Sequence, residues 1–299
     1  MRRNGIRNLV LGTAVASTAL YAALGAQQAA APAGARPTPA LYNTVKQKLR
    51  DGRQVVGATV LIGNPDTYCA VANSGFDFTW IEMQHSPMSW QDVAHMVAAC
   101  KGASAIPFIR VPDATEGDLQ KATDIGALGI MVPMVDTVEK AENAVKFGKY
   151  PPIGRRSQGN NQAGSLWGGN YRQTINDNLM IIAMIENPAG VAMAEKIAAV
   201  PGIDGLFVAS TDLGSFSGLR QGDAKYESLV NQVVAVVQKR GMLVLGGPSA
   251  WKDTRKGYNF FQAGDEAVII RAGARATLGQ ASGAGPGRGV APSEGDAPK

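Results

Sequence analysis

The chain has 299 residues, of which 45% are hydrophobic and 18% are charged. This composition is typical of a globular protein with a sizeable core, and it argues against an intrinsically disordered chain. The formal net charge of +5 does not predict a nucleic-acid-binding protein, because Arg2, Arg3 and Arg7 of the amino-terminal segment supply three of the charges.

Residues 1–36 have the layout of an export signal followed by a linker. The basic residues precede an apolar run at residues 9–24, and small residues follow it. We expect a cleaved signal peptide and an exported, periplasmic or secreted protein. A retained anchor is the alternative, although the run is somewhat shorter than the roughly 20 residues that span a bilayer. Membrane contact is expected only through such an uncleaved signal.

Residues 37–282 alternate between apolar, β-branched runs and helical patterns. A short amphipathic helix is predicted first, at residues 41–52, and eight predicted strands follow. This alternation predicts an α/β fold, a single (β/α)8 TIM barrel. An open doubly wound sheet is the alternative, but no Gly-x-Gly-x-x-Gly follows the first strand. The predicted strands are residues 55–62, 78–83, 105–111, 129–135, 180–186, 202–210, 241–247 and 266–273.

Two segments depart from this alternation. Residues 150–178 form a long, polar, Gly-rich stretch, and a loop of this length predicts a functional role. Residues 283–299 have low complexity and predict a disordered tail.

The chain has two cysteines, Cys69 and Cys100. A disulfide between them is permitted in an oxidising compartment, but two buried free thiols are the interpretation that we favour. No Cys/His cluster has the spacing of a zinc site.

Polar residues follow several of the predicted strands. In a barrel the carboxyl ends of the strands meet at one mouth, where reactive groups lie. Individually these residues could be helix caps or structural ion pairs, and His95, inside a helical pattern, is predicted to lie on the surface or in packing. Together they predict an active site, and they are Gln84, His85, Arg110, Glu186, Ser210, Thr211 and Asp212.

Two of these residues are carboxylates on neighbouring strand ends. Glu186 and Asp212 form a half-shell suited to a hard divalent cation, with positions left for water and an oxygen-rich substrate. Mg²⁺ or Mn²⁺ is therefore the expected cofactor, with Co²⁺ as a further candidate.

The same residues carry a family resemblance. The stretches "GFDFTWIEMQHSPMSWQD", "DLQKATDIGALGIMVPMVDTVEKAENAV", "KYPPIGRRS", "MIEN" and "GIDGLFVASTDLG" occur in the order found in the HpcH/HpaI aldolase family. From about residue 41 to residue 273 the chain resembles these metal-dependent, class II pyruvate aldolases. The resemblance implies a (β/α)8 barrel that forms homo-oligomers.

The resemblance also implies a role for each site residue. Glu186 and Asp212 would hold the metal, Arg110 would stabilise an enolate oxygen, and His85 would be the base. Asp124 would orient that histidine. The substrate-binding residues would be Arg110, Arg156 in the long loop, and Ser210, Thr211 and Asp212 at a helix start that receives the substrate carboxylate. Apart from the resemblance, we expect Trp167, Tyr171 and Arg172 of the long loop to set which aldehyde or other acceptor fits.

The chain also departs from the family pattern. Glu82, Gln84 and His85 stand where members commonly have Asp and then Glu-His, and Met184 replaces a frequent glutamine. Ala209 and Ser210 replace a Gly-Pro pair. After the predicted eighth strand, the Gly-x-Asp pattern that precedes an exchanged terminal helix is missing.

The expected activity is that of a carbon–carbon lyase. It would reversibly cleave a 4-hydroxy-2-oxo acid into pyruvate and an aldehyde through a metal-stabilised enolate, with small molecules and no nucleic acid as partners. One alternative is another enolate-type lyase, as in the citrate lyase β-like branch. The other is a catalytically weakened, exported 2-oxo-acid binding protein, which Met184 and Gln84 favour.

Overall fold

The computed structural model describes residues 41–159 and 161–279. The predicted export signal at residues 1–36 and the predicted tail at residues 283–299 lie outside these ranges. In the described ranges, no helix combines the length and the apolar character that a membrane crossing requires.

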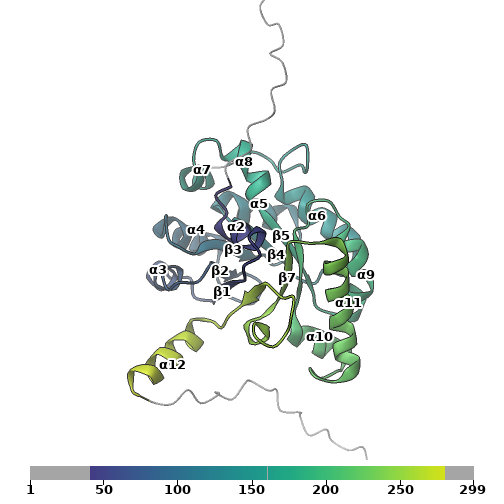
Figure 1. The fold of residues 1–299 in the computed structure, drawn as a ribbon. Coiled ribbons are helices and arrows are strands. Elements are labelled where there is room, and N and C mark those ends of the chain that lie inside the picture. The colour runs from purple at the N-terminus through teal and green to yellow at the C-terminus, as the bar shows by residue number, and fades with distance from the viewer. Residues whose placement is uncertain (1–40, 160, 280–299) are drawn as a thin grey trace, which may run out of the picture. The chain divides into compact units, whose positions relative to one another are not determined.

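Eight parallel strands close into a barrel in the order of the sequence, and β8 is hydrogen-bonded to β1 (Figure 1). The predicted closed barrel is therefore confirmed. In the register between β2 and β3, Glu82 is paired with Arg110, so the two side chains point to the same face of the sheet. The strands are β1 (Val55–Val60), β2 (Phe78–Glu82), β3 (Ile106–Arg110), β4 (Gly129–Val132), β5 (Met180–Ile185), β6 (Gly205–Val208), β7 (Val244–Pro248) and β8 (Phe260–Gln262).

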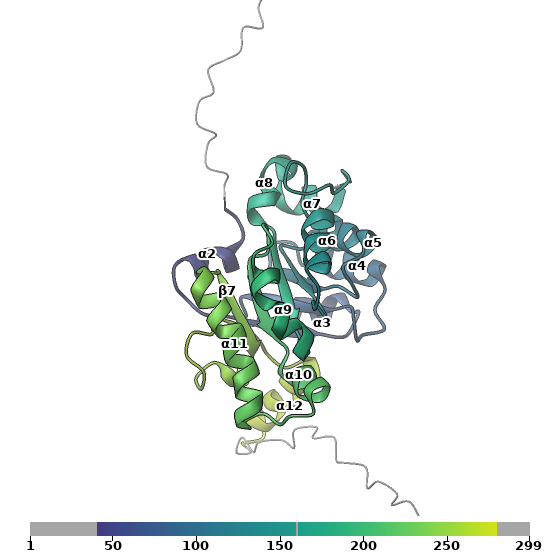
Figure 2. The ribbon, with the colours of Figure 1, turned by 90° about the vertical axis from the view of Figure 1, so that its right-hand side faces the viewer.

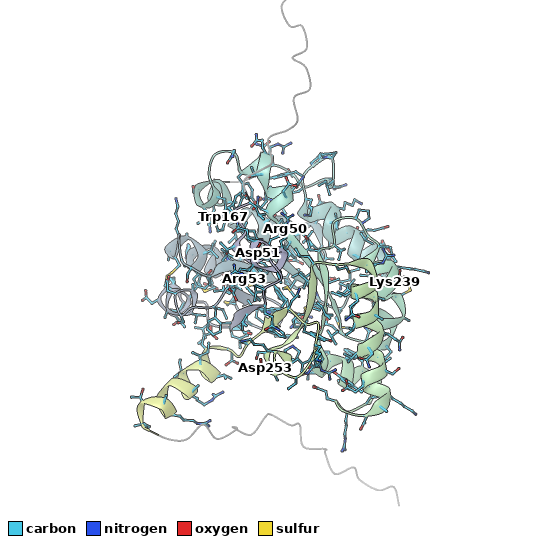
Figure 3. All side chains as sticks on the ribbon, viewed as in Figure 1. Arg50, Asp51, Arg53, Trp167, Lys239 and Asp253 are labelled. Atoms are coloured by element: carbon cyan, nitrogen blue, oxygen red, sulfur yellow. A yellow bond between two sulfur atoms is a disulfide. The ribbon has the colours of Figure 1, made fainter. Side chains whose placement is uncertain are left out.

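Helices cover the outside of the barrel. Most begin at a residue whose side chain accepts a hydrogen bond from the first turn, as Ser89 and Thr115 do. Their outer faces are polar: Lys239 extends away from the barrel (Figure 3), and its side chain is 73% exposed. The helices are α2 (Thr44–Arg50), α3 (Pro65–Ala72), α4 (Trp90–Ala99), α5 (Glu116–Ile125), α6 (Val138–Gly148), α7 (Asn161–Trp167), α8 (Tyr171–Asn178), α9 (Pro188–Ala198), α10 (Ser210–Ser217), α11 (Ala224–Arg240) and α12 (Glu266–Thr277), with a 3-10 turn at Ser249–Trp251.

Phenylalanine side chains fill the inside of the barrel. Phe78, Phe108, Phe207 and Phe260 are buried, and the ring of Phe78 lies with its centroid 4.5 Å from that of Phe260 and 4.9 Å from that of Phe108. Glycines on the strands leave space for these rings, since a Cβ atom on Gly129 would lie 2.2 Å from the Phe108 ring. The barrel is therefore a packed core.

The eighth strand was predicted at the wrong place. Residues 266–273 belong to α12, and β8 is Phe260–Gln262. The Asp265 side chain caps α12 by accepting a hydrogen bond of 2.9 Å from the N–H of Val268. The apolar, β-branched run imitates a strand, whereas a strand of three residues is too short to be seen as a pattern.

Because β8 is Phe260–Gln262, the residues to compare with the Gly-x-Asp pattern of the family are those that follow Gln262. Ala263 follows β8, and the next three residues, Gly264, Asp265 and Glu266, form a Gly-x-Glu pattern. The buried Glu266 accepts hydrogen bonds from the N–H groups of Leu61 (2.9 Å) and Ile62 (3.1 Å). Glu266 therefore ties the start of α12 to the residues that follow β1.

Residues 150–178 contain two helices, α7 and α8, where a long functional loop was predicted. They come between α6 and β5, so they lie at the amino ends of the strands. Figures 1 and 2 place α7 and α8 at the end of the barrel opposite to α10 and α12. Within one chain these helices therefore do not border the mouth at the carboxyl ends.

Cys69 and Cys100 form a disulfide, with their Cα atoms 5.4 Å apart. The predicted pair of free thiols is therefore wrong. Cys69 lies in α3, and Cys100 ends α4, which packs beside α3. This adjacency of two helices is a property of the barrel, and the spacing of the cysteines in the sequence does not encode it.

Candidate active site

A cavity of about 220 Å³ opens at the carboxyl ends of the strands. It brings together residues that lie in the carboxyl-terminal part of six different strands or follow them, as expected for a barrel enzyme. Five of the predicted site residues are among them. The lining residues are His85, Arg110, Met184, Phe207, Ala209, Ser210, Thr211, Asp212, Pro248 and Gln262.

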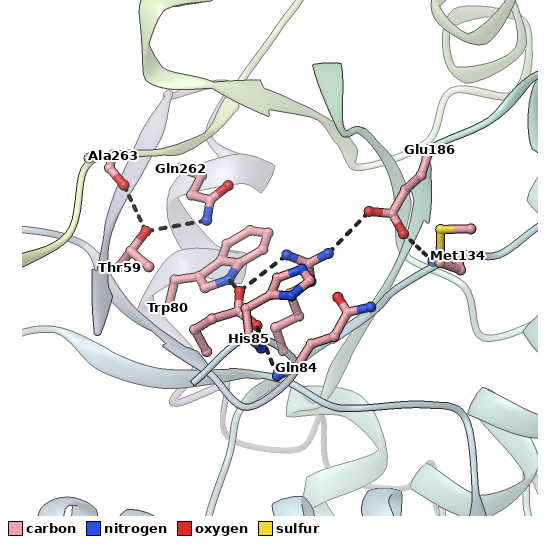
Figure 4. Close-up of polar contacts among 10 residues, drawn as sticks. Thr59, Trp80, Gln84, His85, Met134, Glu186, Gln262 and Ala263 are labelled. Carbon is pink, nitrogen blue, oxygen red and sulfur yellow. Dashed lines mark hydrogen bonds and ion pairs between the residues drawn. The ribbon is translucent and has the colours of Figure 1, made fainter. Parts of the chain in front are cut away.

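The guanidinium of Arg110 is held between two carboxylates, and Figure 4 labels one of them, Glu186. Its Nη1 lies 3.2 Å from Oε2 of Glu82, and its Nη2 lies 3.1 Å from Oε1 of Glu186. All three side chains are buried. We call Glu82, Arg110 and Glu186 the carboxylate clamp. The two carboxylates fix the position of the positively charged guanidinium, and Arg110 lines the cavity.

Glu82 also orders the turn that follows β2. Its Oε1 accepts hydrogen bonds from the N–H groups of Gln84 (2.9 Å) and His85 (3.3 Å), and its Oε2 accepts one from Nε1 of Trp80 (3.1 Å). One carboxylate therefore positions both the guanidinium of Arg110 and the backbone that carries His85. The imidazole of His85 itself is exposed at the cavity.

Glu186 is the most deeply buried acid of the site. Burial raises the pKa of the Glu186 carboxyl to about 6, although Arg110 and the N–H of Met134 act in the opposite direction. Met134 donates that N–H to Oε2 of Glu186 from a backbone with φ 51°, a left-handed conformation that is unfavourable for a residue with a side chain. The loop after β4 is thus held in an unusual shape by its bond to this carboxylate.

Glu186 and Asp212 are hard oxygen donors of the kind that a partly hydrated divalent cation prefers, and the two oxygens of Glu186 also accept hydrogen bonds from Arg110 and Met134. Asp212 lines the cavity, and its charge contributes to the raised pKa of Glu186, so the two carboxylates lie within electrostatic reach of each other. Mg²⁺ is commonly bound by one or two carboxylates while it keeps several waters. A structural zinc site has four protein ligands. Over residues 41–159 and 161–279, no group of three or more His, Cys, Asp or Glu side chains is arranged to hold a metal, so the described residues contain no such zinc site.

Two further polar atoms of the site are buried without a hydrogen-bond partner in the described part of the chain. They are Oε1 of Gln84 and Nε of Arg110. Buried polar atoms normally have partners. Arg110 lines the cavity, so its Nε–H is left as a donor for water or a ligand there, whereas Gln84 is not among the lining residues.

Helix α10 begins at Ser210, directly after β6. Its N-cap, Ala209, makes no side-chain cap, and Asp212 lies in its first turn. The first N–H groups of a helix have no intrahelical acceptor, and they favour anions. The start of α10 therefore presents N–H donors beside the carboxylate of Asp212.

Asp124 and Arg156 do not join this group. Asp124 lies in the last turn of α5, which leads into β4, so it is at the amino ends of the strands. Its carboxylate is 2.5 Å from Nη2 of Arg156 and accepts a 2.7 Å hydrogen bond from Gln120, and Arg156 donates to the hydroxyl of Tyr171 (3.0 Å). Within one chain, Asp124 does not contact His85.

Two residues of the site were not predicted from the sequence: Glu82, which holds Arg110, and Gln262, which lines the cavity. The signal for Glu82 was available, since it is the last residue of β2 and lies opposite Arg110 in the register. Gln262 could not be found, because β8 was placed elsewhere.

Known protein families and solved structures are similar to this chain over the part that forms the site. The sequence profile of the HpcH/HpaI aldolase/citrate lyase family matches residues 60–268. The chain belongs to this family. The HpcH/HpaI match covers β2 to β8 and only the last residue of β1, and it includes the whole carboxylate clamp.

Individual relatives in the HpcH/HpaI family are named aldolases. A 2-keto-3-deoxy-L-rhamnonate aldolase of Salmonella gallinarum is 29% identical over 77% of this chain and 89% of its own length. A hydroxypyruvate/pyruvate aldolase of Roseobacter denitrificans is 33% identical over 60% of this chain and 72% of its own length. The crystal structure of a family protein from Burkholderia cenocepacia has a TM-score of 0.72 and 28% identity, covering 79% of this chain and 98% of that one. The chain is thus an enzyme, a lyase of the aldolase type.

Proposed function

We propose that the protein is a divalent-metal-dependent aldolase that reversibly cleaves a 4-hydroxy-2-oxo acid into pyruvate and an aldehyde. The observation that carries this proposal is the carboxylate clamp beside the cavity. A fixed guanidinium next to Asp212 and a helix start is suited to a substrate that carries a carboxylate and develops negative charge on a neighbouring oxygen. Members of the family generally depend on a divalent metal.

Glu186 and Asp212 are the residues that would hold Mg²⁺ or Mn²⁺, with Co²⁺ as a further candidate. When bound, the cation supplies positive charge against the oxygens of the 2-oxo acid. Arg110 adds a second positive charge, and its free Nε–H is a donor for the developing enolate oxygen. The N–H groups at the start of α10, around Thr211, receive the substrate carboxylate.

His85 is the proposed base. In the cleavage direction its imidazole takes the proton of the 4-hydroxyl group, the C3–C4 bond breaks, and the electron pair of that bond passes into the enolate of pyruvate. The aldehyde leaves, and a proton returned to C3 completes pyruvate. Glu82 acts through its backbone contacts, because they fix the turn on which the histidine lies.

The two histidines of the chain offer a matched test of this proposal. In a retro-aldol assay that detects pyruvate, we expect His85→Ala to lose turnover by at least about 100-fold, the usual scale of a lost general base. His95→Ala changes an exposed residue of α4 and should keep wild-type turnover. Full activity of wild-type protein after metal removal would contradict metal dependence, and metal-dependent pyruvate binding without turnover would indicate a binding protein.

We also propose that the protein is exported. The basic and apolar layout of residues 1–36 supports this, and so does the disulfide, because disulfides persist in oxidising compartments. The mass of the protein recovered from the producing cells should correspond to a chain that begins after the signal, with both cysteines resistant to alkylation before reduction. A full-length chain with two reactive thiols would contradict this.

Homo-oligomer formation is proposed on two grounds. On α12 only Glu266 is buried, while Val268, Ile270 and Leu278 at its end are exposed. In addition, the role predicted for Asp124 requires a second chain, because Asp124 lies at the opposite end of its own barrel from His85. Light scattering at micromolar concentration should give a multiple of the monomer mass, and a monomer would contradict the proposal.

A further inference from the structure

Gln262, the last residue of β8, lies in the wall of the cavity. Its amide is not part of the carboxylate clamp, and Figure 4 shows it above Thr59, across the site from Glu186. The amide Nε2 lies 3.2 Å from Oγ1 of Thr59, and the Thr59 hydroxyl donates a 2.7 Å hydrogen bond to the carbonyl oxygen of Ala263.

These two bonds fix which end of the amide faces the cavity. A carbonyl oxygen can only accept, so Thr59 donates its single hydroxyl proton to Ala263 and is left as an acceptor toward Gln262. Gln262 must therefore turn its NH₂ group to Thr59. Its Oε1 points away from Thr59, toward the middle of the site in Figure 4, and no described residue donates a hydrogen bond to it.

The surroundings of Oε1 define what it can recognise. Pro248 pairs with Gln262 in the register between β7 and β8, so the residue beside Gln262 on the neighbouring strand is apolar. The charged lining residues Arg110 and Asp212 come from other strands, since Arg110 ends β3 and Asp212 follows β6. The wall that β7 and β8 form thus supplies one neutral acceptor beside the apolar Pro248. Such an acceptor is satisfied by a neutral O–H donor, whereas a carboxylate or a phosphate would repel its oxygen.

We propose that Gln262 is a specificity-determining residue that accepts a hydrogen bond from a hydroxyl group of the substrate. The enzyme then favours hydroxylated substrates over their deoxy counterparts. This inference rests on the aldolase function proposed above. The hydroxyl has two possible sources, the 2-oxo acid or the aldehyde.

The test compares hydroxylated and deoxy substrates in two arms. The first arm measures deuterium exchange at C3 of hydroxypyruvate and of pyruvate without aldehyde, and the second measures addition of pyruvate to glycolaldehyde and to acetaldehyde. We expect Gln262→Leu, which keeps the side-chain volume but removes the acceptor, to lower the ratio of kcat/KM for the hydroxylated over the deoxy substrate roughly five- to tenfold. The arm in which the ratio falls identifies the source of the hydroxyl.

Two more variants support the interpretation. Thr59→Val removes the acceptor that orients the amide, so it should lower the same ratio to a smaller extent, and it carries the test if Gln262→Leu does not fold. Gln232→Leu changes an exposed glutamine of α11 and should leave the ratio unchanged. Wild-type turnover with a ratio that is the same in all variants and both arms overturns this inference alone. Wild-type protein that turns over none of the substrates overturns both the aldolase proposal and this inference.

Discussion

Arg110 is held by carboxylates from two different strands, and this arrangement depends on the shape of its side chain. A planar guanidinium presents separate N–H groups to Glu82 and Glu186 at 3.2 and 3.1 Å. Each acid also accepts hydrogen bonds from the backbone: Glu82 from the turn that carries His85, and Glu186 from Met134 in the loop after β4. A change at Arg110 should therefore affect chemistry more than a change at any other arginine.

Arg110→Lys tests this dependence. A single ammonium group cannot bridge both carboxylates and still face the substrate, so we expect kcat/KM for retro-aldol cleavage to fall about 100- to 1,000-fold, the scale of a lost oxyanion donor. The matched control is Arg155→Lys, which alters an exposed ion pair with Glu116 and should keep wild-type kinetics. Wild-type kcat/KM in Arg110→Lys would show that the clamp has no part in catalysis.

The buried Glu186 predicts a pH dependence of stability. Its pKa of about 6 in the folded, metal-free protein lies above the usual value of 4.5, so the folded state binds this proton more tightly than the unfolded state. The stabilisation is fully present below pH 4.5 and is lost as the pH rises through 6. Between pH 7 and pH 5 it should amount to about 1 kcal/mol.

The measurement is urea unfolding of chelator-treated protein at both pH values, compared with Glu186→Gln. The variant has no proton to bind at this position. When the pH falls from 7 to 5, the free energy of unfolding of wild type should therefore rise by about 1 kcal/mol more than that of the variant. An equal change in both proteins would mean that this carboxyl titrates normally.

At the scale of elements, the barrel combines large rings with glycines. Phe78, Phe108, Phe207 and Phe260 meet inside it, and strand glycines such as Gly129 leave the space for them. The sequence predicted the strands from their continuous apolar runs, and seven of the eight fall where the structure has them. It could not predict which glycine faces which ring, because that depends on the register between strands.

Gly129→Ala should destabilise the protein by about 2 kcal/mol, because the new Cβ would lie 2.2 Å from the Phe108 ring and a packed core resists added volume. Urea unfolding measures this change. Gly117→Ala on α5 is the control, since a Cβ there meets no atom within 4 Å, and it should be neutral or slightly stabilising. Equal stability of both variants would mean that Phe108 moves aside without cost.

The features that the sequence did not predict correctly can each be traced to a physical cause. The three-residue β8 gave no pattern, and the β-branched run of α12 imitated a strand although Asp265 marked a helix start. The disulfide joins two helices whose contact arises only in the closed barrel. The positions of Asp124 and Arg156 follow from the topology, because the end of a helix and the segment between it and the next strand lie at the amino ends of the strands.

At the scale of the whole molecule, the closed barrel explains why the site could be predicted in outline. Polar residues that end apolar runs far apart in the chain, such as His85, Arg110 and Asp212, meet at one cavity because all parallel strands share one carboxyl edge. The proposed formation of an enolate requires the residues at this edge and a divalent cation. It can be measured with pyruvate alone, without knowing the acceptor aldehyde. Enolisation of pyruvate is therefore the step on which the proposed chemistry depends.

The decisive measurement is deuterium incorporation into the methyl group of pyruvate in D₂O, followed by NMR with added Mn²⁺ or Mg²⁺ and with a chelator. We predict exchange that requires the metal, disappears in His85→Ala and persists in His95→Ala. Exchange that survives the chelator would contradict metal dependence. No exchange by metal-loaded wild-type protein that binds pyruvate would contradict the aldolase proposal itself.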